Sequence, residues 1–340
     1  MKALVTGGDG YIGSHCVLAL LKKGYDVLIF DSHITGHSEI SKSLSNLGYK
    51  GNVIASVEGN LLKREDIDDV LNKYEIDAVI HFAALSQVAE SIKEPGKYYQ
   101  NNVCGTINLL NSMIDHEVNK IIFSSTAAIY GEPEYTPIDE NHPQRPINPY
   151  GKTKMMVEKI MDDYDIAYGL KSVRLRYFNV IGADSNGIVG EWHEPETHLI
   201  PNILKSTFKT GENFQLFGND YPTKDGTCVR DYLNVEDLAE AHILALEYLN
   251  GGGMTDYFNL GTNGGYTVKE VFSECEKVVG KKIPLDICER RPGDPYSLIA
   301  DNRKAKKILG WEPKRSLSDS IRTAFEWEKK RCGLQWSLKQ

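Results

Sequence analysis

The sequence predicts an α/β fold, with a doubly wound parallel sheet of the Rossmann type and a smaller α/β part after it. Short apolar runs rich in β-branched residues alternate with amphipathic helical segments through the first half of the chain. These apolar runs do not alternate with polar residues, which is typical of strands buried on both faces of a parallel sheet. The chain has 340 residues, and this length favours two domains.

The expected elements of the first half follow in regular order. We expect strands over residues 3–6, 26–30, 52–57, 77–84, 120–126 and 172–180. The segments "IGSHCVLALLKKG" and "REDIDDVLNKYE", which lie between these strands, carry apolar residues at helical spacing. Strands separated by helices predict a first domain over residues 1–178 that binds a dinucleotide.

The pattern of apolar and polar residues changes at the start of the second half. Residues 183–198 are polar, contain glycine and show no periodicity, so we expect a loop or lid there. A short strand over 214–218 and helices over 235–249 and 267–280 follow. We expect a substrate-binding domain over 179–340, with parts of 233–262 returning to the first domain.

Composition and charge exclude several classes of partner. Hydrophobic residues make up 41% of the chain and charged residues 25%, as in ordinary globular proteins. The net charge of −8 argues against nucleic-acid and anionic membrane partners. The six cysteines are scattered without a C-x-x-C pair, and no apolar stretch reaches the length of a membrane span. Since the first residues also lack the pattern of a signal peptide, we expect a cytoplasmic protein.

The sequence "VTGGDGYIG" near the N-terminus predicts a phosphate-binding turn. Gly7, Gly10 and Gly13 follow the first strand and open the first helix. Glycines allow a tight turn and a close approach to a pyrophosphate at the helix N-terminus. Asp31 ends the second strand, where a carboxylate accepts hydrogen bonds from a ribose diol and repels a 2′-phosphate. Because Ser32 and no arginine follows it, the pattern favours NAD over NADP.

A second group of residues predicts proton and hydride chemistry. Thr126 ends a strand, and Tyr150 and Lys154 lie four residues apart at the start of a helix. Residues at this spacing share a helix face, so the lysine lies near both the tyrosine and a cofactor ribose. A tyrosine in this position takes a proton from an alcohol while a dinucleotide takes the hydride.

The charge of Lys154 could supply most of the free energy that Tyr150 needs to act as a base at neutral pH. Lowering the pKa of a phenol from about 10 to about 7 requires ~4 kcal/mol. An ammonium about 6 Å away, at an effective dielectric constant of about 20, supplies ~3 kcal/mol. We therefore expect Lys154 to lower the pKa of Tyr150, with the positive nicotinamide ring of NAD⁺ supplying the remainder.

Eight motifs together show that the chain resembles the extended short-chain dehydrogenase/reductase family, and within it the nucleotide-sugar 4-epimerases. The resemblance extends over nearly the whole chain. The motifs are "VTGGDGYIGSH", "VIHFAA", "YYQNNV", "IFSSTAAIYGE", "NPYGKTK", "RYFNVIGA", "FGNDYPTKDGTCVRDY" and "RRPGD". The resemblance implies an NAD-dependent interconversion of UDP-glucose and UDP-galactose through a 4-keto sugar, with NAD tightly bound throughout.

The resemblance also implies a role for individual residues. Thr126, Tyr150 and Lys154 are the catalytic positions. The cofactor positions are Gly7, Gly10, Tyr11, Ile12, Gly13, Asp31, Ser32, Asn60, Leu61, Phe82, Ala83, Ala84, Ser86, Asn101, Thr126, Tyr150, Lys154 and Phe178. The UDP-sugar positions are Thr126, Tyr150, Asn179, His198, Leu199, Phe217, Arg230, Tyr232, Arg291, Asp294 and Leu298.

Four of these positions depart from the common family pattern. Asn60 replaces an aspartate, Ser86 a lysine and His198 an asparagine. Leu298 stands where members confined to plain hexoses can carry a tyrosine that closes the sugar pocket. Because leucine is smaller, we expect UDP-N-acetylglucosamine and UDP-N-acetylgalactosamine to be substrates too.

Three alternative functions stay open. A 4,6-dehydratase shares the fold, NAD and the tyrosine–lysine pair, but that family places Asp-Glu after the threonine, where this chain has Ala127 and Ala128. A net dehydrogenase would consume free NAD and release NADH. A non-catalytic NAD-responsive regulator is expected to have lost part of the catalytic triad, which is intact here.

Two further expectations concern metals and partners. His193, Glu194 and His198 are possible metal ligands, but their spacing matches no standard zinc helix, so we expect no metal site. The segments over 97–118 and 154–168 carry apolar stripes at helical spacing. In the resembling family the corresponding helices form a homodimer, so we expect one here.

Overall fold

The computed structural model describes residues 1–208, 213–290 and 295–333. Its largest element is a seven-stranded parallel sheet in the order β11-β6-β5-β4-β1-β2-β3. The strands are β1 (Lys2–Thr6), β2 (Asp26–Asp31), β3 (Val53–Glu58), β4 (Ala78–His81), β5 (Lys120–Thr126), β6 (Lys171–Tyr177) and β11 (Asp256–Leu260). The strand order reverses at β1, which has β2 on one side and β4 on the other. In sheets of this kind, ligands bind beyond the carboxyl ends of the strands at such a point.

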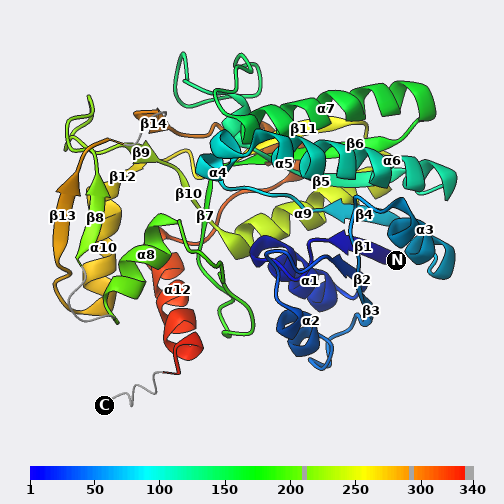
Figure 1. The fold of residues 1–340 in the computed structure, drawn as a ribbon, viewed down its shortest axis with the longest axis horizontal. Helices are drawn as coiled ribbons and strands as arrows, with labels where there is room; N and C mark the ends of the chain where they lie inside the picture. The colour runs from blue at the N-terminus through cyan, green and yellow to red at the C-terminus, as the bar shows by residue number, and fades with distance from the viewer. Residues whose placement is uncertain (209–212, 291–294, 334–340) are drawn as a thin grey trace.

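Helices cover both faces of this sheet (Figure 1). On one face α1 (Tyr11–Lys23) packs against α9 (Val235–Asn250), and their apolar residues share a core with Val5, Ile29 and Ile122. On the other face α3 (Arg64–Lys73), α6 (Gly105–Asp115) and α7 (Pro149–Tyr168) pack against Leu4, Leu28 and Ile121. Neighbouring strand residues thus face opposite cores. The doubly wound fold that the sequence predicts is confirmed.

Two predicted strands end earlier than expected. The run over 77–84 leaves the sheet after His81, because the amides of Phe82 and Ala83 both donate to the carbonyl oxygen of Thr6, at 2.9 and 3.1 Å. The run over 172–180 is interrupted at Phe178. Residues Asn179–Ile181 form a separate strand, β7, which pairs with β10 (Tyr232–Asn234) in a two-stranded sheet. Both breaks turn the chain away from the sheet at its carboxyl edge.

Smaller sheets form the second part of the molecule, on the left of Figure 1. One contains β9 (Val229–Arg230), β12 (Tyr266–Thr267) and β14 (Ser297–Leu298), and another pairs β8 (Phe214–Phe217) with β13 (Leu285–Cys288). Helices α8 (Leu199–Ser206), α10 (Val268–Val279) and α12 (Leu317–Arg331) share a core with Phe214, Leu216 and Tyr232. The hydroxyl of Thr267 caps α10 by accepting from the amide of Glu270 at 3.1 Å.

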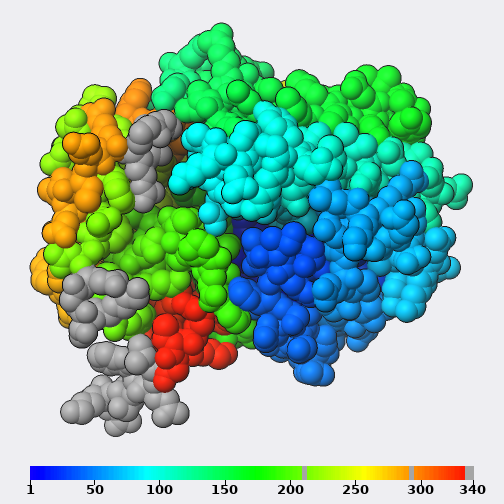
Figure 2. Space-filling model, viewed as in Figure 1, coloured from blue at the N-terminus to red at the C-terminus, as the bar shows by residue number. Residues whose placement is uncertain are grey.

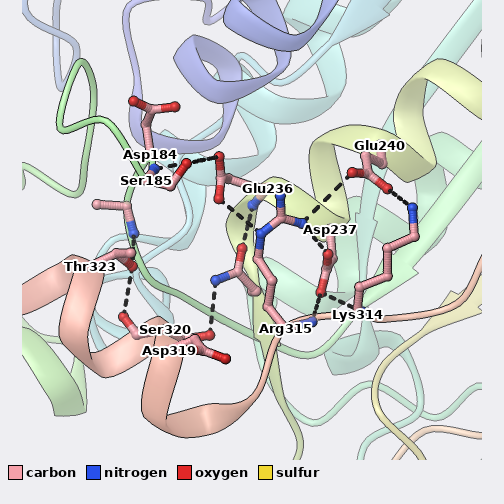
Figure 3. Close-up of polar contacts among 12 residues, drawn as sticks. Asp184, Ser185, Glu236, Asp237, Glu240, Lys314, Arg315, Asp319, Ser320 and Thr323 are labelled. Carbon is pink, nitrogen blue, oxygen red and sulfur yellow. Dashed lines mark hydrogen bonds and ion pairs between the residues drawn. The ribbon is translucent and has the colours of Figure 1, made fainter.

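The C-terminal segment is anchored to α9 by a polar network (Figure 3). The guanidinium of Arg315 forms ion pairs with Asp237 and, at 2.9 Å, with Glu236. Asp237 also accepts the amides of Lys314 and Arg315, at 2.9 and 3.0 Å. Ser185 donates from its hydroxyl to Glu236 at 3.3 Å, so the same network fixes the start of the loop over 183–198.

The remaining elements connect these layers. They are α2 (Ser38–Leu44), α4 (Val88–Lys93), α5 (Pro95–Tyr98), the π-helical turn η1 (Tyr99–Cys104), the 3₁₀ turn η2 (Ala127–Ile129) and α11 (Arg303–Leu309). In the part of the chain that the structure describes, no helix has both the length and the apolar character needed to cross a membrane.

Candidate active site

A cavity of about 1690 Å³ lies beyond the carboxyl ends of β1, β2, β4 and β5, where the large sheet faces the second part of the molecule. Figure 2 shows this boundary from one side, where cyan and blue residues of the first half meet green residues of the second. Residues predicted as site residues that line the cavity are Gly7, Gly10, Tyr11, Ile12, Gly13, Asp31, Ser32, Asn60, Leu61, Phe82, Ala83, Ala84, Ser86, Asn101, Thr126, Tyr150, Lys154, Phe178, Asn179, His198, Leu199, Phe217, Arg230 and Tyr232. Arg291 and Asp294 lie outside the described residues.

The glycine turn leaves no room for side chains. Gly7 has a φ of +72°, and a Cβ there would stand 2.6 Å from the amide nitrogen of Ala83. A Cβ on Gly13 would stand 2.0 Å from the carbonyl oxygen of Gly7. The turn therefore presents bare backbone at the N-terminus of α1, which suits a pyrophosphate.

Asp31 and Asn60 stand beside this turn, at the ends of β2 and β3. The Asp31 carboxylate accepts the amides of Asp9 and His33, at 3.0 and 2.9 Å, which fixes its orientation. Each carboxylate oxygen has further acceptor capacity for a ribose hydroxyl. The amide oxygen of Asn60 accepts the amide of Leu62 at 2.9 Å, so this side chain is held against its own chain. The donor and acceptor set at the turn fits the adenosine half of NAD.

Tyr150 and Lys154 are brought to the cavity by the first turn of α7. Pro149 begins the helix, and Asn148 caps it by accepting the amide of Gly151 at 2.8 Å. Lys154 is buried and donates from Nζ to the carbonyl oxygen of Ser124 at 2.7 Å. Thr126 ends β5, and its hydroxyl is near enough to Tyr150 to act against a rise in the pKa of the phenol.

The pKa values of this pair differ from the expectation. Burial raises the pKa of Tyr150 to about 12, and the nearby hydroxyl of Thr126 opposes this rise. Burial lowers the pKa of Lys154 to about 7, and the nearby carboxylate of Glu158 opposes this fall. The expectation that Lys154 brings the pKa of Tyr150 below its usual value is therefore wrong for this structure. Loss of hydration acts on both groups against their charged forms and is the largest cause of both shifts.

A buried ion pair holds α7 against strands of the large sheet. Glu158, one turn beyond Lys154, accepts from Nε of Arg176 at 3.0 and 3.2 Å and from the hydroxyl of Ser125 at 2.5 Å. All three residues are at most 2% exposed. Arg176 also donates to the hydroxyl of Tyr130 at 3.0 Å. This network fixes the helix face that carries Tyr150 and Lys154 relative to β5 and β6.

The cavity lining includes residues that the sequence does not predict as site residues, among them Ser124 and Tyr177. Ser124 and Tyr177 line the cavity beside Tyr150 and Lys154, and their hydroxyl groups are hydrogen-bonded to each other. Their signal in the sequence is their position at the carboxyl ends of two predicted strands, where functional residues of parallel sheets gather.

Leu298 lies in β14, next to the cavity-lining strand β9. It is paired in register with Arg230 and packs against the apolar cluster that contains Phe178. Arg230 and Phe178 line the cavity, whereas Leu298 is not among its described lining residues. The structure therefore places Leu298 next to lining residues of the cavity, and its role in the sugar pocket stays a prediction.

The loop over 183–198, here called the strap, closes one side of the cavity. It contains no helix or strand, as expected. Trp192 stacks on His37 with ring centroids 3.6 Å apart, and the Tyr11 hydroxyl donates to the carbonyl of Gly182 at 2.6 Å. The strap thus packs against residues that flank the glycine turn.

Two histidines and two glutamates meet at the C-terminal end of the strap. Nδ1 of His198 lies 2.9 Å from Glu191 and 2.8 Å from Glu196, and Nδ1 of His193 lies 3.2 Å from Glu191. The carboxylates raise the pKa of His198, and the histidines lower that of Glu191. Glu194, which the sequence analysis had grouped with the histidines, instead accepts the indole N–H of Trp192 at 3.0 Å.

Comparison with known proteins agrees with this geometry. Residues 4–324 match the sequence family described as GDP-mannose 4,6 dehydratase. UDP-glucose 4-epimerase of Lactobacillus helveticus is 52% identical over 330 residues, which cover 97% of each chain.

Solved structures extend the similarity to the fold. UDP-glucose 4-epimerase from Bifidobacterium longum in complex with NAD⁺ and UDP has a TM-score of 0.92 and 37% identity, covering 98% of this chain and 99% of that one. The UDP-Glc/GlcNAc 4-epimerase of Campylobacter jejuni has a TM-score of 0.84 and 37% identity, covering 97% and 99%. The fold, the placement of the threonine, tyrosine and lysine, and these full-length similarities lead to one conclusion: the chain belongs to the UDP-glucose 4-epimerase family.

Proposed function

We propose that the protein interconverts UDP-glucose and UDP-galactose with a tightly bound NAD. The observation that carries this proposal is the meeting of Thr126, Tyr150 and Lys154 in one cavity with the glycine turn and Asp31. Full-length similarity to UDP-glucose 4-epimerases supports it.

The residues around the glycine turn would hold the cofactor. The backbone from Gly7 to Gly13 would receive the pyrophosphate, and Asp31 the adenosine ribose. When bound, NAD accepts a hydride from C4 of the sugar and returns it to the opposite face of the 4-keto sugar.

Tyr150 would remove the proton of the 4-hydroxyl and later return it. A phenol whose pKa is about 12 is almost fully protonated at neutral pH. Lowering the pKa by about 5 units requires ~7 kcal/mol in the reacting complex. Protonated Lys154 and the Thr126 hydroxyl stabilise the phenolate form, so we treat the tyrosine and lysine as one coupled titrating unit.

Residues of the second part would bind the UDP-sugar. Arg230 is 8% exposed and lines the cavity, and its guanidinium suits diphosphate oxygens. Asn179, Leu199, Phe217 and Tyr232 line the same region. Arg291 and Asp294 keep the binding roles that the family resemblance implies.

The chain favours epimerisation over dehydration. Elimination of water from the sugar requires an acid and a base in addition to the tyrosine. The two positions after Thr126, where a dehydratase carries its acidic pair, are Ala127 and Ala128.

We extend the proposal to the N-acetylated UDP-hexoses. Leu298 lies beside Arg230 and packs against the cluster that contains Phe178, so the size of residue 298 would set how much room this wall leaves for a 2-acetamido group. The similarity to the C. jejuni epimerase, whose description includes both sugars, supports this extension.

The domain boundary, the assembly state and the location are also proposals. We divide the chain near residue 178, with 233–262 returning to the first domain, which β11 in the large sheet supports.

We propose a homodimer through α6 and α7, because Met156, Ile166 and Tyr168 on α7 are 41%, 86% and 60% exposed. Six free cysteines favour the cytoplasm. Sedimentation and cell fractionation test these two proposals.

The activity is tested by incubating the purified protein with UDP-galactose without added NAD. We expect UDP-glucose as the product and no free NADH. Tyr150→Phe should lower the rate by about 10²–10⁴-fold, the range for loss of a general acid–base, and Tyr135→Phe, at an exposed tyrosine outside the described cavity lining, serves as its control. A 4-keto-6-deoxy product would identify a dehydratase, and release of NADH a dehydrogenase.

A further inference from the structure

We propose that Glu191, His193, Glu196 and His198 form a binding site for one zinc ion on the strap. Each of the four side chains offers a ligand atom, and these atoms all lie within 4.8 Å of one another. The sequence carries no standard zinc motif here; the fold of the strap brings the donors together.

The distances in this cluster fit tetrahedral zinc. Zinc binds imidazole nitrogen and carboxylate oxygen at about 2.0–2.2 Å, which places neighbouring ligand atoms about 3.4 Å apart. Nδ1 of His193 lies 3.2 Å from Glu191 and 3.9 Å from Glu196. Nδ1 of His198 lies 2.9 Å from Glu191 and 2.8 Å from Glu196. Each imidazole thus approaches both carboxylates, His193 at Oε2 of Glu196 and His198 at Oε1, and one of these two oxygens would be the ligand.

Two buried atoms in the cluster lack hydrogen-bond partners. Among the described residues, neither Nδ1 of His193 nor Oε2 of Glu196 makes a hydrogen bond. The side chain of Glu196 is only 5% exposed, and that of Glu191 7%. Within the described part of the chain, the lysine or arginine that pairs with Oε2 of Glu196 is Lys205, at 3.6 Å, and a cation at the centre would contact this oxygen directly.

The charges of the cluster and its surroundings are compatible with a bound divalent cation. Two carboxylates face two imidazoles, and Lys205 approaches Oε2 of Glu196 at 3.6 Å. With neutral imidazoles the cluster and this lysine sum to −1, so a Zn²⁺ ion brings the total to +1. The alternative is a metal-free cluster in which protonated His198 and Lys205 balance the two carboxylates.

Zinc at this position would join both ends of the segment Glu191–His198 and hold it against α1. The ring of His193 meets the ring of Tyr11 edge to face, with centroids 6.1 Å apart. Tyr11 is the first residue of α1, directly after the glycine turn. The ion would therefore be structural for the strap, and the proposal does not depend on which reaction the cavity catalyses.

The test uses the full chain without an affinity tag, stripped with a chelator and titrated with Zn²⁺ by calorimetry. Metal analysis of the dialysed protein gives the stoichiometry. We expect one zinc per chain and a higher melting temperature. His193→Gln and Glu196→Gln should each weaken zinc binding by more than about 100-fold, beyond the 10–100-fold that loss of an outer partner costs. His116→Gln, a histidine at the end of α6, should bind zinc like the unaltered chain.

Cobalt substitution distinguishes this site from a cysteine site. Co²⁺ bound by nitrogen and oxygen should show visible bands without thiolate charge transfer. The proposal is overturned if the unaltered chain binds no zinc, if Co²⁺ shows thiolate ligation, or if zinc binding survives both substitutions. If one variant fails to fold, the other variant and the metal content of the unaltered chain still show whether the cluster binds zinc.

Discussion

Lys154 donates a hydrogen bond of 2.7 Å from its ammonium group to the main-chain carbonyl oxygen of Ser124. This bond holds the lysine of α7 against the carboxyl end of β5, beside the tyrosine one helical turn earlier. Both Lys154 and Tyr150 are less than a tenth exposed, so neither charge is stabilised by bulk water. Under the proposed function, we expect the reactivity of the tyrosine to depend on the lysine being charged when the phenolate forms.

Replacing Lys154 by methionine should remove this charge and lower kcat with UDP-galactose by at least about 10²-fold. The matched control is Lys152→Met, an exposed lysine on the same turn of α7. Steady-state kinetics of both variants provide the comparison. Equal kcat values in the two variants would exclude an electrostatic role for Lys154.

Gly13→Ala should abolish retention of NAD. The new Cβ would stand 2.0 Å from the carbonyl oxygen of Gly7, so the phosphate-binding turn has to open. The nucleotide released from the denatured protein can be measured by chromatography. Gly96→Ala is the control, since a Cβ there meets nothing within 4 Å, and this variant should keep its NAD. Full NAD content in Gly13→Ala would contradict the assigned turn.

Glu158→Gln should destabilise the fold by about 3–5 kcal/mol, because it leaves Arg176 buried without its carboxylate. Asp163→Asn removes the same charge from an exposed position of α7 and should change the stability little. Urea unfolding of both variants measures the difference in the free energy of unfolding. Similar midpoints would mean that the buried ion pair contributes no net stability.

Stability should fall as the pH drops below about 6.5. Burial lowers the pKa of His81 to about 3 and of His242 to about 4, whereas the ordinary value is 6.5. The unfolded chain therefore binds protons that the folded chain cannot, and stability is greatest above pH 6.5. At pH 5 each histidine costs about 2 kcal/mol.

Chemical unfolding at several pH values tests this dependence. His81→Gln is less stable overall but should lose about 2 kcal/mol less than the unaltered chain between pH 8 and pH 5. A pH dependence as steep as that of the unaltered chain would assign the acid sensitivity to other groups.

Leu298→Tyr should lower the ratio of activity on UDP-N-acetylgalactosamine to activity on UDP-galactose by at least about tenfold. A larger side chain beside Arg230 and the Phe178 cluster should reduce the room for a 2-acetamido group at this wall. Leu298→Met, which conserves volume, should keep the ratio. An unchanged ratio in the tyrosine variant would show that residue 298 does not limit the pocket.

The sequence was sufficient to predict the large sheet but not where its strands leave it. The runs that became β1, β2 and β5 were recognisable because residues such as Leu4, Val5 and Ile121 are apolar on both faces. The break at Phe178 depends on pairing of β7 with β10, some fifty residues later, and no local pattern reports such a partner. Strand β11 was missed as a strand for the same reason, although its region was expected to return to the first domain.

In the candidate site, too, local motifs were predictable from the sequence, whereas features that depend on distant residues were not. Motif spacing was enough to select Tyr150, Lys154 and the glycines, because each motif lies within one turn or helix. The pKa values of the pair were mispredicted because a distance along a helix carries no information about burial. The sequence analysis names His193 and His198 but not Glu191 and Glu196, because these glutamates become their neighbours only when the strap folds back on itself.

The position of β11 also has a consequence for biosynthesis. The nucleotide-binding sheet gains its edge strand and the covering helix α9 only after residue 260 has been translated. Until then the nascent chain exposes the face of α1 that Leu238 and Leu246 later cover, and a truncated product that ends near residue 180 would be a substrate for chaperones and proteases.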